Sequence, residues 1–176
     1  IDGGLMKGAY GIGAAIALYE ADMLTCFNGV VGISSGAPTA AYALAGSPHI
    51  GASIMWDELC SRRFINPWRI FKLVNTDYFR AIMEGITFKQ LIPDHVLYNG
   101  VPFYIGLTNF KTAEPYLYRP DTVTGLYDGI QASSTMPIMS TKRIFINGER
   151  YTDGAFSEPH ILQHTYDSLE FTHLLV

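Results

Sequence analysis

The segment Gly32-Ile33-Ser34-Ser35-Gly36 has the residue types and the spacing of a nucleophilic serine on a tight turn. In the pattern G-x-S-x-G, the glycines leave room for the neighbouring backbone, so that the serine hydroxyl projects from a strand-to-helix turn. The apolar pair Val30-Val31 precedes the pattern and an alanine-rich segment follows it, as such a turn requires. The N-terminus of the following helix would stabilise negative charge that develops near the hydroxyl. Taken alone, the pattern also fits a tight turn whose serine has no chemical role.

A second candidate is the loop that opens the chain, Asp2-Gly3-Gly4-Leu5-Met6-Lys7-Gly8. Two adjacent glycines allow backbone N–H groups to converge on one point, as the binding of an anion or an oxyanion requires. A nucleotide-phosphate loop is disfavoured, because neither G-x-G-x-x-G nor a G-K-[ST] ending is present. The loop also fits a simple tight turn between a strand and a helix. Lys7 fits either a solvated charge or a side chain that bonds to the loop carbonyls.

A serine nucleophile needs a proton acceptor within hydrogen-bond reach. Asp153 is the stronger candidate, because it follows a predicted hairpin and the small Gly154 and Ala155 leave its carboxylate uncrowded. An Asp-Gly turn without a chemical role is the alternative. His160 and His164 are four residues apart and would share one face of a helix, so a Ser–Asp–His arrangement stays open, as does weak metal binding.

The remaining pattern predicts the elements that must position these groups. The hydrophobic spacing and the Gly and Pro punctuation predict helices over residues 8–21, 35–45 and 124–134, and strands over 27–31, 101–107 and 116–119. Asn147-Gly148 between two short apolar runs predicts a hairpin with a type I′ turn that leads into Asp153. This alternation predicts an α/β fold with a mostly parallel central sheet and helices on both faces.

Composition sets the class of protein. With 176 residues, 48% of them hydrophobic, the chain can form one folded domain with a sizeable core. We expect a single domain, residues 1–176, truncated at both ends, because the chain opens without methionine and closes on a strand-like run. A net charge of −4 disfavours broad nucleic-acid binding. Cys26 and Cys60 are expected to be buried free thiols. No apolar run reaches the roughly 18 residues that a membrane span needs, and we expect a cytoplasmic or peripheral-membrane location.

Taken together and in this order, three segments resemble the patatin-like phospholipases. They are the glycine loop, the serine pattern with its flanking Gly32 and Gly36, and Asp153-Gly154-Ala155. Ala132-Ser133-Ser134, Pro137 and Pro159 also resemble that family's residues around its aspartate.

The resemblance implies a serine–aspartate dyad without a catalytic histidine. Ser34 would attack the ester carbonyl of a phospholipid or lysophospholipid while Asp153 takes its proton and later activates water. Backbone N–H groups of Gly3, Gly4 and Leu5 would bind the oxyanion. No cofactor or metal is expected. An aspartate is a weak base at its ordinary pKa, so burial should raise that pKa.

Leu5 departs from the family pattern, which has a third glycine there. If this position needs a positive φ, leucine is strained by about 1 kcal/mol or more. A misdirected N–H would lower the rate about a hundredfold. A lipid-binding or scaffolding protein without full activity is therefore an alternative, and an acyltransferase that uses the same residues is another.

Residues 62–72 contain four of the twelve basic residues of the chain and no acidic residue. Basic residues interleaved with Trp68 and two phenylalanines suit an anionic membrane surface, and we predict peripheral membrane contact there. An ordinary amphipathic cap whose aromatic side chains face the core is the alternative.

Overall fold

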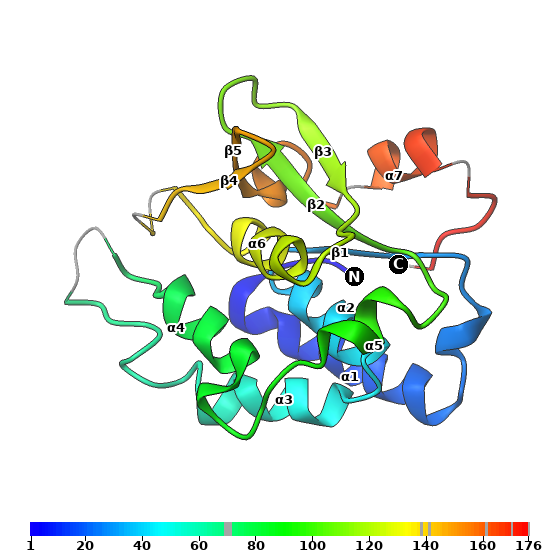
Figure 1. Ribbon diagram of the computed structural model, residues 1–176, viewed down its shortest axis with the longest axis horizontal. Helices are drawn as coiled ribbons and strands as arrows, with labels where there is room; N and C mark the ends of the chain where they lie inside the picture. Colours follow the sequence, from blue (N-terminus) through cyan, green and yellow to red (C-terminus); the bar gives the residue numbers. More distant parts are fainter. Residues whose placement is uncertain (69–71, 138, 141, 161, 170, 176) are drawn as a thin grey trace.

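The computed structural model describes residues 1–68, 72–137, 139–140, 142–160, 162–169 and 171–175 (Figure 1). Its strands are β1 (Val30–Ile33), β2 (Phe103–Asn109), β3 (Pro115–Tyr118), β4 (Ile144–Ile146) and β5 (Glu149–Asp153). Its α-helices are α1 (Gly8–Glu20), α2 (Gly36–Leu44), α3 (Pro48–Asp57), α4 (Thr76–Ala81), α5 (Pro93–Leu97), α6 (Val123–Ser133) and α7 (Leu162–Leu169). The short elements are the 3-10 helices η1 (Leu5–Lys7), η2 (Leu24–Cys26) and η4 (Gly154–Phe156), and the π-helical turn η3 (Ile82–Ile86).

The strand β2 is the centre of the sheet, because three other strands pair with it. β3 pairs with residues 105–108 of β2, β1 with residues 103–106, and β5 with residues 107–109. The partners of β3 overlap those of both β1 and β5. Since a strand has only two edges, β1 and β5 must share the edge opposite β3, one after the other.

This register brings the ends of two strands together. Ile33, the last residue of β1, is paired with Gly106, and Asp153, the last residue of β5, is paired with Leu107. Because β1 runs parallel to β2 and β5 runs antiparallel, both strands end at the same point along β2. Ser34, the residue after β1, therefore lies beside Asp153.

The α/β class is confirmed, but the sheet is mixed rather than mostly parallel. Among the described strands only the pair β1–β2 is parallel, and the other three pairs are antiparallel. The short loop after β2 and the tight Asn147-Gly148 turn both return the chain directly, and parallel pairing would need a long crossover. Asn147 and Gly148 have φ values of 53° and 82°, which confirms the type I′ turn.

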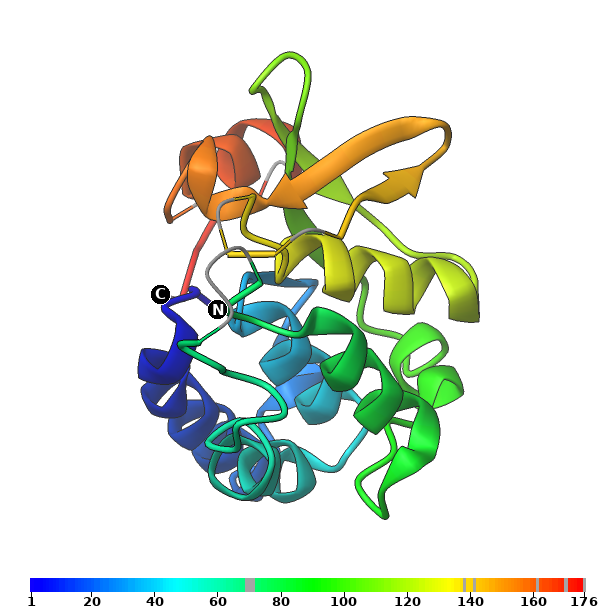
Figure 2. The ribbon, with the colours of Figure 1, turned by 90° about the vertical axis from the view of Figure 1, so that its left-hand side faces the viewer.

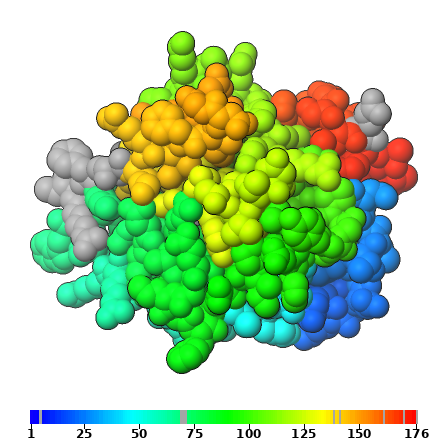
Figure 3. All heavy atoms as spheres, in the orientation of Figure 1, coloured from blue at the N-terminus to red at the C-terminus, as the bar shows by residue number. Residues whose placement is uncertain are grey.

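Helices cover the sheet in layers. α2 packs on β1 and β2, α6 packs on β2, β4 and β5, and α1 and α3 pack outside α2. In Figure 2, α6 lies below the hairpin of β4 and β5, and the C-terminal helix α7 (red) lies above and to the left of this hairpin. On the side seen in Figure 3, α4, α5 and α6 lie at the surface together with the hairpin of β4 and β5. Every residue of α2 except Pro38 is buried.

Most predicted helices and strands are present with small shifts at their ends. The predicted strand over residues 27–31 instead begins at Val30, because Leu24–Cys26 form a 3-10 turn and only residues 30–33 pair with β2. Cys26 and Cys60 are free, as expected, but both are exposed rather than buried. Cys26 ends η2 and Cys60 follows α3, so both lie at element ends outside the packed layers.

The start of the chain lies along the outer edge of β1. The Ile33 N–H donates to the Ile1 carbonyl at 3.1 Å, and the Ile1 nitrogen donates to the Val31 carbonyl at 2.6 Å. This segment crosses directly over the start of α2, where a Cβ on Gly36 would lie 2.0 Å from the Ile1 oxygen. The glycine loop is thereby placed above Ser34.

Gly36→Ala should therefore destabilise the protein, because the added methyl cannot fit without moving the first residues of the chain. We expect the free energy of unfolding in urea to fall by about 2 kcal/mol, in the range of overpacked cores. Gly13→Ala is the matched control: position 13 lies inside α1 with nothing within 4 Å of an added Cβ. This control should gain about 0.5–1 kcal/mol. Equal effects of the two changes would contradict the close packing.

Candidate active site

Ser34 lies in a strained turn between β1 and α2. Its φ of 53° is in the left-handed region, which costs a non-glycine residue about 1–2 kcal/mol. Its N–H donates to the Ser133 hydroxyl at 2.8 Å, and that hydroxyl donates to the Gly106 carbonyl at 2.8 Å. The fully buried Ser133, at the end of α6, therefore holds the turn in place.

The glycines of the serine pattern make this turn possible. A Cβ on Gly32 would lie 2.7 Å from the Ala37 Cα, and a Cβ on Gly36 would meet the first residues of the chain. Both positions are therefore close approaches of backbone to backbone. This agrees with the prediction that small residues on either side of Ser34 leave room for the turn.

The carboxylate of Asp153 accepts two hydrogen bonds. Its Oδ2 accepts from the Ser34 hydroxyl at 2.7 Å, and its Oδ1 accepts from the Ala155 N–H at 3.0 Å. The Asp153 N–H donates to the Thr135 carbonyl at 3.1 Å, which fixes the backbone. Asp153 is 1% exposed and Ser34 is 6% exposed, so the pair is shielded from water. Gly154 is buried and begins η4, where a Cβ would lie 2.6 Å from the Gly106 carbonyl.

Burial raises the pKa of Asp153 above its ordinary value of 3.8, because the charged form loses its hydration. The hydrogen bonds from Ala155 and Ser34 stabilise the charged form and oppose this effect. A raised pKa suits a carboxylate that acts as a base, because a higher pKa makes the carboxylate a better proton acceptor.

The two histidines considered from the sequence do not join this pair. The Asp153 carboxylate has Ser34 and Ala155 as its hydrogen-bond partners among the described residues. His160 lies before α7, so it shares no helix face with His164, contrary to that expectation. The His160 Nδ1 lies 2.9 Å from the Asp2 carboxylate at the surface.

The glycine loop lies directly over the Ser34 side chain. A Cβ on Gly3 would lie 2.4 Å from the Ser34 Cβ and 3.1 Å from its Oγ, so only glycine fits there. Within the described part of the chain, the Gly3 and Gly4 N–H groups donate to no protein acceptor. Of these two glycines, Gly3 is the one that lies against the Ser34 hydroxyl.

Positive φ in this loop falls on Gly4, at 142°. Leu5 begins the 3-10 helix η1, a right-handed conformation that leucine adopts without strain. The backbone strain that a positive φ would cause at Leu5 is therefore absent, because Gly4 has the positive φ instead. Lys7 is exposed, and its N–H closes the loop on the Gly4 carbonyl at 3.0 Å. A Cβ on Gly8 would lie 2.6 Å from the Ser35 Oγ, so α1 also packs tightly on the serine turn.

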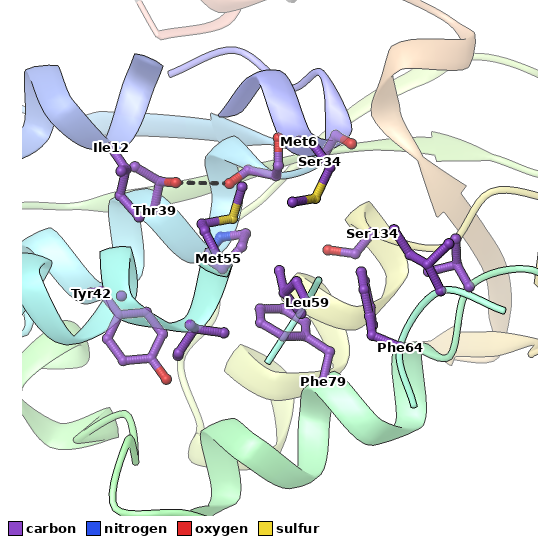
Figure 4. Close-up of a pocket in the computed structure, with 16 residues that line it drawn as sticks. Met6, Ile12, Ser34, Thr39, Tyr42, Met55, Leu59, Phe64, Phe79 and Ser134 are labelled. Carbon is purple, nitrogen blue, oxygen red and sulfur yellow. Dashed lines mark hydrogen bonds between the residues drawn. The ribbon is translucent and has the colours of Figure 1, made fainter. Parts of the chain in front are cut away.

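An apolar pocket opens beside Ser34, under the glycine loop and between the helices. Figure 4 shows Ser34 and Met6 on one side of it and Tyr42 and Phe79 on the other. The Tyr42 hydroxyl donates to the Lys89 carbonyl at 2.7 Å, which fixes the far wall. The apolar side chains around the pocket include Met6, Pro38, Met55, Leu59, Phe64 and Phe79.

The basic and aromatic segment 62–72 borders this pocket. Phe64 is buried and lines the pocket, whereas Trp68 is 84% exposed. Near the two ends of this segment, the Asn66 N–H donates to the Leu73 carbonyl at 2.9 Å. Of the two described aromatic residues of this segment, Phe64 thus faces the core and Trp68 the solvent. Residues 69–71 of this segment lie outside the described residues.

An α/β protein that holds a serine hydroxyl against a buried carboxylate contains the groups of a serine hydrolase. The family model of patatin-like phospholipases matches residues 1–164, and the chain belongs to this family of lipid acyl hydrolases. Among curated proteins, no relative matches the chain. In the described residues, no helix combines the length and the apolar character needed to cross a membrane.

Sequence reasoning assigned no role to Ser133, although its contact with the Ser34 N–H forms part of the site. The residue belongs to the segment Ala132-Ser133-Ser134 that marked the approach to the aspartate. The two consecutive serines at the end of a mostly apolar helix were the sequence feature that could have indicated such a role. Its contact with a residue 99 positions away was not visible in the sequence.

The raised pKa of Asp153 predicts a specific effect of pH on stability. The unfolded carboxyl loses its proton near 3.8 and the folded one at higher pH, so the wild type loses stability as pH rises through this window. Asp153→Asn cannot ionise. Its free energy of unfolding relative to wild type, measured in urea, should therefore increase between pH 3.5 and pH 7. Asp22→Asn, which removes an exposed carboxylate, is the control for net charge. A constant difference for Asp153→Asn would contradict the prediction.

Proposed function

We propose that this protein hydrolyses fatty-acyl ester bonds of phospholipids or lysophospholipids, with Ser34 as the nucleophile and Asp153 as the base. The observation that carries the proposal is the 2.7 Å hydrogen bond from the Ser34 hydroxyl to a buried carboxylate. A hydroxyl in this position can transfer its proton as it attacks.

The reaction takes place in two halves. The Ser34 Oγ bonds to the ester carbonyl carbon while its proton passes to Asp153, and the tetrahedral species then expels the alcohol, which takes that proton. Asp153 next accepts a proton from water as the water attacks the acyl-enzyme. The second tetrahedral species then expels the Ser34 oxygen, which takes this proton back from Asp153, and the fatty acid leaves. This sequence requires neither metal nor cofactor.

The oxyanion formed in each half needs hydrogen-bond donors. We assign these to the backbone N–H groups of Gly3, Gly4 and Leu5. Two observations support this role: Gly3 lies against the Ser34 side chain, and the Gly3 and Gly4 N–H groups have no acceptor among the described residues. The N-terminus of α2 directly follows Ser34 and adds a favourable dipole.

The apolar pocket suits the acyl chain of the substrate. Its walls are mostly hydrocarbon, and burial of each methylene is worth about 0.8 kcal/mol. Arg62, Arg63 and Trp68 of the segment 62–72 are all exposed, and we assign to this segment the contact with the lipid surface. A substrate lipid drawn from that surface would meet the pocket next to Phe64.

A fluorophosphonate probe tests the nucleophile directly. The wild type should be labelled covalently and should hydrolyse p-nitrophenyl esters, because Asp153 activates the Ser34 hydroxyl. Ser34→Ala should lose both labelling and hydrolysis, and Asp153→Asn should lose at least about a thousandfold in kcat/KM. Ser157→Ala, which alters a serine outside the pocket, is the control and should keep labelling. Absence of labelling in the folded wild type would favour a lipid-binding protein instead.

The membrane assignment is tested by the double variant Arg62→Gln/Arg63→Gln. Loss of these two charges should weaken hydrolysis of anionic phospholipid vesicles by up to about thirtyfold, because each basic residue at the surface contributes about 1 kcal/mol. Hydrolysis of a soluble butyrate ester should stay unchanged. Lys111→Gln/Arg143→Gln removes the same charge at other exposed positions and is the matched control. Equal loss on vesicles and on the soluble ester would refute the assignment.

A further inference from the structure

Three buried hydroxyl oxygens in the described residues have no hydrogen-bond partner: those of Ser35, Thr76 and Ser134. A buried polar group without a partner destabilises a fold, so each such group calls for a physical reason. Two of the three, Ser35 and Ser134, line the pocket that also contains Ser34. Thr76, at the start of α4, is not part of the pocket lining.

Of these two, Ser134 is the better placed to meet a ligand. Figure 4 shows its hydroxyl directed into the pocket, on the same side as Ser34. The Ser35 hydroxyl instead lies against α1, where a Cβ on Gly8 would come within 2.6 Å of it. The walls around Ser134 are mostly apolar, so the surrounding side chains leave its hydrogen-bonding capacity unused.

The backbone of Ser134 is fixed relative to the nucleophile. Its N–H donates to the Ile130 carbonyl at 3.1 Å at the end of α6. Its neighbour Ser133 accepts the hydrogen bond from the Ser34 N–H at 2.8 Å. Ser134 therefore follows directly on the residue that holds the Ser34 turn, and it lines the same pocket as Ser34 with a hydroxyl that has no partner among the described residues.

We propose that Ser134 is a substrate-binding residue whose hydroxyl donates a hydrogen bond to the ester group under attack by Ser34. The inference rests on the proposed function and deepens it. An acyl chain offers only carbon and hydrogen, so the ester oxygens are the acceptors that such a substrate brings to this end of the pocket. The hydroxyl has no partner among the described protein groups, and the ester oxygen of a bound substrate would supply one.

The test is hydrolysis of two soluble esters, p-nitrophenyl butyrate and p-nitrophenyl decanoate, by Ser134→Ala. We expect kcat/KM to fall about tenfold on both esters, because both contain the same ester group. The melting temperature should be equal to or above that of wild type, since an unsatisfied buried group is removed. Thr76→Val removes the unpaired hydroxyl outside the pocket and should leave kcat/KM unchanged on both esters.

Each other result overturns the proposal. Full activity of Ser134→Ala excludes a contact with the ester, and a loss confined to the decanoate assigns Ser134 to the shape of the acyl pocket alone. If Ser134→Ala is unfolded, Ser134→Cys replaces the hydroxyl with a weak donor of similar shape, and an unchanged kcat/KM in that variant also excludes the contact. A wild type that neither hydrolyses esters nor reacts with fluorophosphonate overturns the proposed function as well, whereas an active wild type with an active Ser134→Ala overturns this inference only.

Discussion

The structure depends on the meeting of two strand ends along one edge of β2. Ile33 and Asp153 are paired with Gly106 and Leu107, which are consecutive residues. A parallel strand and an antiparallel strand therefore terminate at one point, and the groups at their ends lie within hydrogen-bond distance. The hydroxyl of Ser34 and the carboxylate of Asp153 are 119 residues apart in the chain, and this register alone makes them neighbours.

Each of the two groups occupies a costly environment that the surrounding fold maintains. Ser34 has a left-handed backbone, which is held by the Ser133 hydroxyl and by close backbone packing at Gly36. Asp153 is removed from water and retains a raised pKa. Strain and desolvation of this kind are typical of functional sites, because they prepare groups for chemistry at the expense of stability. The apolar layers around α2 and α6 supply the compensating stability.

The helical layer also divides the site into a polar and an apolar part. The polar part consists of the strand ends and the glycine loop, and the apolar part is the pocket between the helices. Substrates with a polar ester and a hydrocarbon chain match this division, in agreement with the lipid chemistry of the family. The unpartnered Ser134 hydroxyl lines the pocket together with Ser34, so it belongs to the end of the pocket where the two parts meet.

The local features could be predicted from residue types and spacing: the serine turn, the Asn147-Gly148 hairpin turn, the main helices and the α/β class. These features depend on residues close together in the chain, so their residue types and spacing suffice to predict them. Other features became apparent only in the folded structure. They are the mixed pairing of the sheet, the exposure of both cysteines, the positive φ at Gly4 rather than at Leu5, and the position of His160 outside a helix. The tertiary structure also decided the role of Ser133 and the hydrogen bond between Ser34 and Asp153. Each of these depends on which distant segments pack together, and that information is carried by the register of β2 and the packing of α6 rather than by any local pattern.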